Sequence, residues 1–312
     1  MNYIGIDLGG INTAAALVSG EGEILRKRSV PTPRTPEAVA DVIAEHVRVL
    51  SADAGELAPC IGIGAPGALD PERGVISYWS NLQFREVPLA DMVRSRTGIP
   101  AVLENDANCA ALGEFVSGAG KGSRSLVVIT LGTGIGGGAV LNGRLATGLN
   151  GGGMEVGHMV IQHRGRPCSC GRKGCFETYC SATALVREAR RAMERDAGSA
   201  LWSLAGSPEK LNGKLVFQAA AEGDPAAKGV LDEFLDYLGS GVTSLINVFQ
   251  PEVFCIGGGL AGAGEQIMAP VRQIVEREVY ARDEDVRTRV LRAALGNDAG
   301  LIGAALLIRY RT

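Results

Sequence analysis

The sequence carries little net charge and no long apolar run. Its 312 residues have a formal net charge of −3 at pH 7, which offers no basic surface for binding nucleic acid. The longest uncharged stretch, residues 125–143, is interrupted by glycines and threonines that disfavour a membrane-spanning helix. We therefore expect neither a nucleic-acid partner nor a membrane partner.

The sequence also lacks the features of a secreted protein. Residues 3–7 already predict a strand directly after Met1, so we expect no signal peptide. Its seven cysteines are an odd number without a distributed disulfide framework, which fits a reducing compartment. These features predict a cytoplasmic protein.

Two common nucleotide-binding motifs are missing or incomplete. A Gly-Lys pair at residues 120–121 is followed by Gly122, where a Walker A loop requires serine or threonine. The glycines of residues 132–137 match G-x-G-x-x-G, but residues 139–141 predict a strand where a dinucleotide site requires a helix. Both a P-loop fold and a Rossmann fold are therefore disfavoured.

Glycine, in contrast, is abundant and clustered. The 44 glycines concentrate in residues 5–10, 132–138, 148–157 and 257–264. The first two clusters each join two predicted strands, so their glycines occupy hairpin turns. The backbone N–H groups of Gly9 and Gly10 can approach an anion closely, and Asp7 can face a magnesium ion. An ordinary glycine hairpin with Asp7 as a turn residue is the alternative.

One imidazole and three thiols lie close together in the sequence, at His158, Cys168, Cys170 and Cys175. They form the ligand set of a closed, tetrahedral Cys₃His zinc site. Glycines and a proline in the intervening chain permit tight turns, so the sulfurs can converge. Four protein ligands leave no open position for substrate, and the predicted role of the zinc is structural. Buried or disulfide-bonded cysteines are the alternative, although C-x-C is a poor disulfide spacing.

Five segments together resemble one known family. They are D-L-G-G from Asp7, E-N-D-A-N from Glu104, L-G-T-G-I-G-G-G from Leu131, E-V-G-H from Glu155, and C-S-C-G-R-K-G-C-F-E from Cys168. In this order they are similar to the ROK family of bacterial sugar kinases and sugar-responsive repressors, over nearly the whole chain. The resemblance implies an α/β, two-domain actin-like ATPase fold of the hexokinase or ribonuclease H-like type, with the active site in the interdomain cleft.

The length and the 46% of hydrophobic residues also suggest two domains. With the resemblance, we expect a small N-terminal α/β domain at residues 1–120 and a larger domain with the zinc loop at residues 121–297. The helix of residues 298–312 is expected to pack back on the first domain. Thr35 and Pro36 predict the start of a helix, as its N-cap and first helical residue.

Asp106 is the candidate general base. Phosphoryl transfer to a sugar requires a base beside the acceptor hydroxyl. The matching aspartate of the family takes the proton of this hydroxyl as its oxygen attacks the γ-phosphate of ATP. The alternative is that Asp106 only caps the helix that begins near Ala107.

The resemblance implies a set of sugar-binding residues, namely Gly67, Asn81, Asn105, Asp106, Glu155, His158 and Glu177. Carboxylates, amides and an imidazole can form paired hydrogen bonds to neighbouring hydroxyls. His158 would use one ring nitrogen for zinc and the other for the sugar, so the metal would fix its tautomer. Solvated loop carboxylates are the alternative for Glu155 and Glu177.

The resemblance also implies ATP and Mg²⁺. The predicted nucleotide-binding residues are Asp7, Gly9, Gly10, Thr133 and Gly134 for the phosphates and magnesium, and Gly257, Gly258 and Gly259 for the adenosine.

Four positions depart from the motifs or lie outside them. The family usually has threonine after the paired glycines, where this chain has Ile11. Thr13, two residues on, would point to the same side if the segment is a strand. Phe84 replaces a common tryptophan and is expected to reshape the pocket rim. His46, outside every motif, is expected at the surface or in a loop.

The predicted activity is ATP-dependent phosphorylation of a hexose. Glucose, giving glucose 6-phosphate, is favoured because Gly9-Gly10-x-Asn12 resembles the glucokinase-like members of the family. N-acetylmannosamine, N-acetylglucosamine, mannose and fructose are alternative acceptors. A non-catalytic sugar-sensing ROK protein and a nucleotide-binding interaction module are the alternative functions. Since many relatives are dimers, we expect a homodimer or a higher homo-oligomer.

Overall fold

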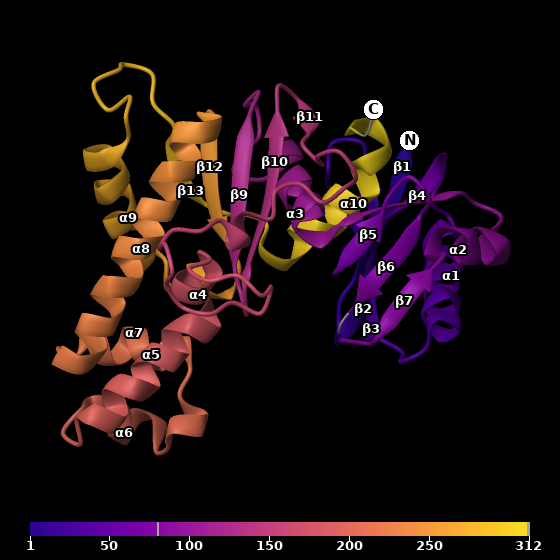
Figure 1. Cartoon of the computed structure of the whole chain (residues 1–312). Helices are drawn as coiled ribbons and strands as arrows, with labels where there is room; N and C mark the ends of the chain where they lie inside the picture. The colour runs from indigo at the N-terminus through magenta and orange to yellow at the C-terminus, as the bar shows by residue number, and fades with distance from the viewer. Residues whose placement is uncertain (80, 311–312) are drawn as a thin grey trace. The chain divides into compact units, whose positions relative to one another are not determined.

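The computed structural model describes residues 1–79 and 81–310, and its chain divides into two compact units (Figure 1). The first unit comprises residues 1–128, 138–154 and 293–312, and the second comprises residues 129–137 and 155–292. The chain therefore passes between the units more than once. Within the part of the chain that is described, no helix combines the length and the apolar character needed to cross a membrane.

The first unit is built on a five-stranded sheet of order β3-β2-β1-β4-β8. β1, β2 and β3 are antiparallel neighbours, whereas β4 lies parallel to both β1 and β8. The strands are β1 (Asn2–Leu8), β2 (Asn12–Ser19), β3 (Ile24–Pro31), β4 (Leu57–Ala65) and β8 (Ala101–Asn105). Because β1, β4 and β8 run in one direction, Asp7 and Glu104 both lie at the carboxyl ends of these strands, on the same side of the sheet's length.

Helices pack on both faces of this sheet. Ile4, Ile6 and Leu8 of β1 share one hydrophobic cluster with α1 (Pro36–Ser51) and α2 (Leu89–Thr97). Tyr3, on the alternate face, belongs to a cluster with α10 (Ala299–Tyr310), which also packs on α3 (Asp106–Val116). This distribution follows the two-residue period of a strand that is buried on both sides.

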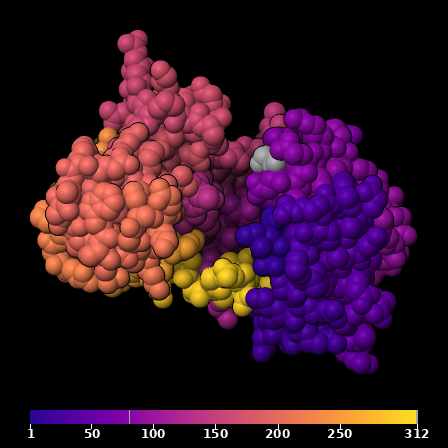
Figure 2. Space-filling view, turned by 90° about the horizontal axis from the view of Figure 1, so that it is seen from below, coloured from indigo at the N-terminus to yellow at the C-terminus, as the bar shows by residue number. Residues whose placement is uncertain are grey.

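Two glycines allow α10 to lie directly on the sheet. A Cβ atom on Gly5 would lie 2.2 Å from the carbonyl oxygen of Leu301, and one on Gly62 would lie 1.7 Å from that of Ala304. Any larger residue at these positions would push the helix away from β1 and β4. In Figure 2, the C-terminal residues in yellow accordingly lie beside the N-terminal residues in indigo.

The start of α1 is confirmed and the position of His46 is corrected. Thr35 caps the helix, accepting a hydrogen bond at Oγ1 from the N–H of Ala38 at 3.3 Å, and Pro36 follows in the first turn. His46 is not at the surface: its side chain is 1% exposed. It lies three residues after Ile43, on the buried face of α1.

A small antiparallel sheet of order β5-β6-β7 completes the first unit, with β5 (Ala68–Asp70), β6 (Val75–Trp79) and β7 (Phe84–Val87). Trp79 and Phe84 pack edge to face, with ring centroids 5.5 Å apart. Phe84 is 5% exposed and belongs to the main core of the unit. Phe84 therefore lies in the core with its ring on Trp79, and its effect on the rim of a pocket stays a prediction.

A second five-stranded sheet has the order β11-β10-β9-β12-β13. Its strands are β9 (Leu126–Leu131), β10 (Ile135–Leu141), β11 (Arg144–Leu145), β12 (Val253–Gly257) and β13 (Arg289–Arg292). The division between the units passes through β9 and β10. The predicted strand, glycine turn and strand at residues 126–141 are confirmed.

The remaining helices belong to the second unit. They are α4 (Glu177–Cys180), α5 (Ala182–Arg195), α6 (Ala200–Ala205), α7 (Gly213–Ala221), α8 (Pro225–Phe249) and α9 (Glu265–Glu278). Short 3₁₀ turns lie at Val156–His158, Pro208–Lys210 and Gly259–Ala263 in this unit, and at Gly296–Asp298 in the first. The segment that contains the cysteines, residues 159–176, is an irregular loop that leads into α4.

Candidate functional site

The turn between β1 and β2 exposes backbone donors. The N–H of Gly9 donates to the carbonyl oxygen of Asn12 at 3.0 Å, which closes a tight turn. The N–H groups of Gly10 and Ile11 make no hydrogen bond to any residue within 1–79 and 81–310. Two adjacent free N–H groups in a glycine turn form a concave site that suits an anion.

Ile11 and Thr13 do not share one side of this turn. The side chain of Ile11 is 81% exposed, whereas Thr13 is fully buried. The Thr13 hydroxyl is 3.0 Å from that of Thr32. The expectation that Thr13 could supply a hydroxyl near the anion is therefore wrong. Ile11 precedes the first residue of β2, so the alternation of a strand does not apply between it and Thr13.

Three carboxylates gather at the carboxyl ends of β1 and β8. Burial, together with the negative charge of Asp106, raises the pKa of Asp7 to about 6, while Lys27 acts in the opposite direction. Burial also raises the pKa of the Cys109 thiol, and the charges of Glu104, Asp106 and Asp7 add to this effect. A region so rich in negative charge suits a cation or a group that takes up a proton.

The segment from Glu104 to Asn108 is fixed by its own hydrogen bonds. Glu104 is 1% exposed, and its Oε1 accepts from the N–H of Asn105 and from Nδ2 of Asn108, at 2.9 and 3.0 Å. Asn105 caps α3 by accepting from the N–H of Ala107. Asp106 follows as the first residue of the helix, and its side chain is exposed. Asn105 is therefore the N-cap, and Asp106 presents its carboxylate at the helix start.

The raised pKa of Asp7 predicts that the stability of the folded protein depends on pH. The folded protein holds the Asp7 proton more tightly than the unfolded chain does, so this stabilisation is complete below about pH 4 and is lost as the pH rises through about 6. Two pKa units correspond to about 3 kcal/mol. Relative to wild type, Asp7→Asn is expected to be more stable by up to this amount at pH 7 and nearly equal at pH 4.

Urea unfolding of both proteins at pH 4, 5, 6 and 7 measures this difference. Comparing the variant with the wild type cancels the contributions of other titrating groups. If the difference in the free energy of unfolding between Asp7→Asn and the wild type did not change with pH, the raised pKa of Asp7 could not be its cause.

Asn81 and Gly67 also lie in the first unit, close to constrained glycines. A Cβ atom on Gly10 would lie 3.0 Å from Nδ2 of Asn81, so the Asn81 amide packs directly on the glycine turn. Gly67 has a φ of 91°, and a Cβ atom there would lie 2.3 Å from the carbonyl oxygen of Tyr78. The structure thus brings together Asn81, which was predicted to bind the sugar, and Gly10, which was predicted to bind the phosphates of ATP.

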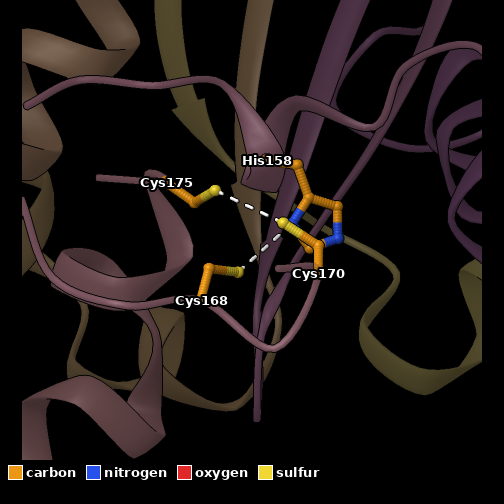
Figure 3. A group of neighbouring side chains, drawn as sticks. All are labelled: His158, Cys168, Cys170 and Cys175. Carbon is orange, nitrogen blue, oxygen red and sulfur yellow. Dashed lines mark hydrogen bonds between the residues drawn. The ribbon is translucent and has the colours of Figure 1, made fainter. Parts of the chain in front are cut away.

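In the second unit, His158, Cys168, Cys170 and Cys175 converge (Figure 3). Their potential ligand atoms all lie within 4.8 Å of one another. The Sγ atoms of Cys170 and Cys175 are 3.7 Å apart, and Sγ of Cys168 is 3.6 Å from Nδ1 of His158. All four cysteine and histidine side chains point toward one centre, although they come from a loop and a 3₁₀ turn.

These distances fit a zinc ion. Tetrahedral zinc with ordinary bond lengths places two sulfurs about 3.8 Å apart and a sulfur and a nitrogen about 3.6 Å apart. All seven cysteines are free thiols, so the structure contains no disulfide bond in this loop. Burial raises the pKa of the Cys168 thiol to about 12, but coordination to a cation deprotonates a thiol outright.

Glu177 lies between this cluster and the turn after β9. The Cys168 thiol donates to Oε1 of Glu177 at 3.1 Å, and Nδ1 of His158 is 3.7 Å from the same oxygen. A Cβ atom on Gly134 would lie 2.6 Å from Oε2 of Glu177. Glu177 is therefore partly buried beside two predicted sites, whereas Glu155 is exposed.

Two glycine turns of the second unit are neighbours. Gly258 has a φ of 81°, and a Cβ atom there would lie 2.5 Å from the backbone nitrogen of Leu131. Thr133 and Gly134 follow in the turn between β9 and β10. A pocket of about 760 Å³ opens next to Gly259, lined also by Lys214, Phe217, Gln218 and Leu260. Sequence reasoning missed the residues of α7 in this lining, because no local motif links α7 to the turn after β12.

The predicted residues thus fall into two groups. The first unit holds Asp7, Gly9, Gly10, Gly67, Asn81, Asn105 and Asp106. The second holds Thr133, Gly134, Glu155, His158, Cys168, Cys170, Cys175, Glu177, Gly257, Gly258 and Gly259. Within each unit the residues gather at the ends of strands and in the loops that follow them.

The sequence profile of the ROK family matches residues 3–311, and the chain belongs to this family. It is 42% identical to a glucokinase of Thermotoga maritima, over 100% of this chain and 98% of that protein. It is 40% identical to a glucokinase of Streptomyces coelicolor, over 98% and 97% of the two chains.

A solved structure extends the comparison to the fold. The ROK family glucokinase from Streptomyces griseus, in complex with glucose and AMPPNP, is 39% identical to this chain and superposes with a TM-score of 0.81. The match covers 98% of this chain and 99% of that one. The predictions of the ROK family and of an α/β fold of the actin-like type are confirmed.

Proposed function

We propose that the protein is an ATP-dependent hexose kinase that converts glucose to glucose 6-phosphate. The observation that carries this proposal is the match, over nearly the full length of both chains, to a glucokinase whose structure holds glucose and AMPPNP. The two curated glucokinases of similar length support the same activity. The exposed carboxylate of Asp106 at the start of α3 supplies a group suited to the chemistry.

In the proposed reaction, Asp106 is the general base. Its carboxylate takes the proton from a glucose hydroxyl, whose oxygen attacks the γ-phosphorus of ATP, and ADP leaves. Its Oδ1 is held at 2.8 Å by the N–H of Ala107, so the carboxylate is oriented before the sugar arrives. The charge of Asp106 contributes to the raised pKa of Asp7, so the two carboxylates interact electrostatically.

We assign glucose to the sugar-binding residues that the sequence predicts. Asn81, Asn105, Glu155, His158 and Glu177 supply hydrogen-bonding groups for several hydroxyls, and Gly67 lets the backbone approach the ring. Nδ1 of His158 faces the thiols, so Nε2 is the nitrogen assigned to the sugar. A sugar that lacked a bonded hydroxyl would leave one of these polar groups unpaired.

We assign the phosphates of ATP to the two glycine turns. The free N–H groups of Gly10 and Ile11 support the assignment for Gly9 and Gly10, and Thr133 and Gly134 form the second turn. Adenosine is assigned to Gly257, Gly258 and Gly259, beside the pocket lined by Phe217. Asp7 would hold Mg²⁺, which neutralises phosphate charge when bound.

His158, Cys168, Cys170 and Cys175 would hold a structural Zn²⁺. The fit of their distances to tetrahedral zinc supports this assignment. The metal would keep the loop of residues 159–176 in the conformation that presents His158 and Glu177. Free thiols and the need for ATP support a cytoplasmic location, and a homodimer or higher homo-oligomer remains our prediction for the assembly.

Kinase assays over a panel of sugars test the proposal. The purified protein with Mg·ATP is offered glucose, mannose, fructose, N-acetylglucosamine and N-acetylmannosamine, and ADP production is measured. We expect the largest kcat/KM for glucose. A larger value for another sugar would replace glucose as the acceptor, and sugar binding without turnover on any of the five would favour a sugar-sensing role.

A further inference from the structure

Thr32, immediately after β3, holds the glycine turn between β1 and β2. Its hydroxyl donates to the carbonyl oxygen of Gly9 at 2.7 Å. Its backbone N–H donates to the carbonyl oxygen of Ile11 at 2.8 Å. Thr32 therefore binds two carbonyl groups of the turn between β1 and β2, and its side chain is 8% exposed.

This contact fixes the orientation of one backbone N–H group of the turn, that of Gly10. The carbonyl of Gly9 and the N–H of Gly10 belong to the same trans peptide, so they point in opposite directions. Fixing the carbonyl on the Thr32 hydroxyl thereby fixes the direction of the Gly10 N–H. Without that bond, a Gly-Gly peptide rotates easily, because neither residue has a side chain that restricts it.

A second hydroxyl orients the first. Since the hydrogen of Thr32 is directed at Gly9, the Thr13 hydroxyl donates to Oγ1 of Thr32 at 3.0 Å. Thr13 is fully buried in β2, so this donor has a rigid position. The two hydroxyls form a short chain that ends on the turn.

We propose that Thr32 is a positioning residue for nucleotide binding, which orients the Gly10 N–H toward the phosphates of ATP through the carbonyl of Gly9. This inference rests on the proposed function, which assigns the phosphates to this turn. It adds a residue that lies in none of the motifs shared with the family.

The test compares Thr32→Val, which keeps the shape of the side chain, with Thr32→Ser, which keeps the hydroxyl. Loss of one buried hydrogen bond predicts a rise of about threefold to tenfold in the KM for ATP and in the Kd for Mg·AMPPNP in Thr32→Val. The KM for glucose should stay within about twofold of the wild type, because the turn is not assigned to the sugar. Thr32→Ser should restore nucleotide binding.

Thr243→Val is the matched control, since Thr243 of α8 is also buried, at 5% exposed, and its hydroxyl donates to the carbonyl oxygen of Gly239 rather than to the turn. It should lower the Tm as Thr32→Val does, with a smaller change in the KM for ATP. Equal changes in the two variants would indicate general destabilisation and overturn the proposal. Unchanged nucleotide binding in Thr32→Val would also overturn it.

The same measurements separate this inference from the proposed function. If the wild type binds Mg·AMPPNP but phosphorylates no hexose, the kinase proposal fails, and the Kd values of the variants still decide the role of Thr32. If the wild type turns over glucose and Thr32→Val binds nucleotide normally, only this inference fails. A wild type that binds no nucleotide would overturn both.

Discussion

Asp106→Asn is expected to lower kcat with glucose by about 10²- to 10⁴-fold, the usual contribution of a general base. An asparagine side chain keeps the size of the aspartate and an oxygen that can accept from the N–H of Ala107, but it cannot take a proton. The change should leave the Tm close to its wild-type value, because the side chain is exposed. The KM for glucose should change far less than kcat, because an asparagine amide can still hydrogen-bond a sugar hydroxyl. Steady-state assays of ADP production measure the effect.

Asp91→Asn is a suitable control for this experiment. Asp91 is an aspartate of α2 whose side chain is 65% exposed, and it pairs only with its neighbour Arg94 among the ion pairs of the described residues. Its replacement should leave kcat unchanged. If Asp106→Asn kept more than about a tenth of the wild-type kcat, another group would have to be the base.

Removing the predicted metal should have the second large effect. The purified protein is expected to contain one zinc ion per chain, and Cys175→Ser should lose most of it, because a closed site depends on all four ligands. The loop of residues 159–176 has little regular structure of its own, so metal binding contributes directly to its folding. We expect the Kd for glucose to rise by at least about tenfold, in line with the effect of disturbed metal sites.

Zinc content by mass spectrometry and glucose binding by calorimetry measure these two quantities independently of turnover. Cys180→Ser provides the control, since Cys180 is a buried thiol of the adjoining helix α4 that lies outside the cluster. It should retain zinc and glucose binding. A wild-type protein that binds glucose equally well after chelation of all metal would show that the cluster does not order the sugar-binding loop.

Local sequence patterns predicted the local structures well. Thr35 and Pro36 gave the start of α1, since a cap and a proline act within one helical turn. The glycines of residues 132–138 predicted a turn between β9 and β10, where the chain reverses within a few residues. The ligand set of the cysteine loop predicted a convergence that the distances bear out, although the identity of the metal stays a prediction.

The sequence was less informative where the surroundings of a residue decide its position. Thr13 was expected near an anion, but the strand begins only at Asn12 and directs this hydroxyl inward to Thr32. His46 could have been placed correctly, because it shares the helical spacing of Ile43 and Leu50 on the buried face. No motif surrounds His46, so this periodicity is the only local signal of its burial.

Contacts between distant parts of the chain could not be predicted at all. Glu114 is 1% exposed and accepts hydrogen bonds from the N–H groups of Ala119, Ala294 and Leu295. Two of these donors lie about 180 residues away in sequence, so no local pattern could indicate them. The roles of Asp106 and of the sugar-binding residues likewise rest on resemblance, and they stay predictions until the variants are measured.

The packing of α10 on β1 has a consequence for the order in which the protein is made. β1 leaves the ribosome well before its partner helix, residues 299–310, which is synthesised nearly 300 residues later. Until then, the face of the sheet around Gly5 and Gly62 has no covering helix, and its apolar side chains stay open to association with other chains. The second unit, whose residues 155–292 are continuous, can fold earlier. We therefore expect the nascent first unit to depend on chaperones for longer than the second.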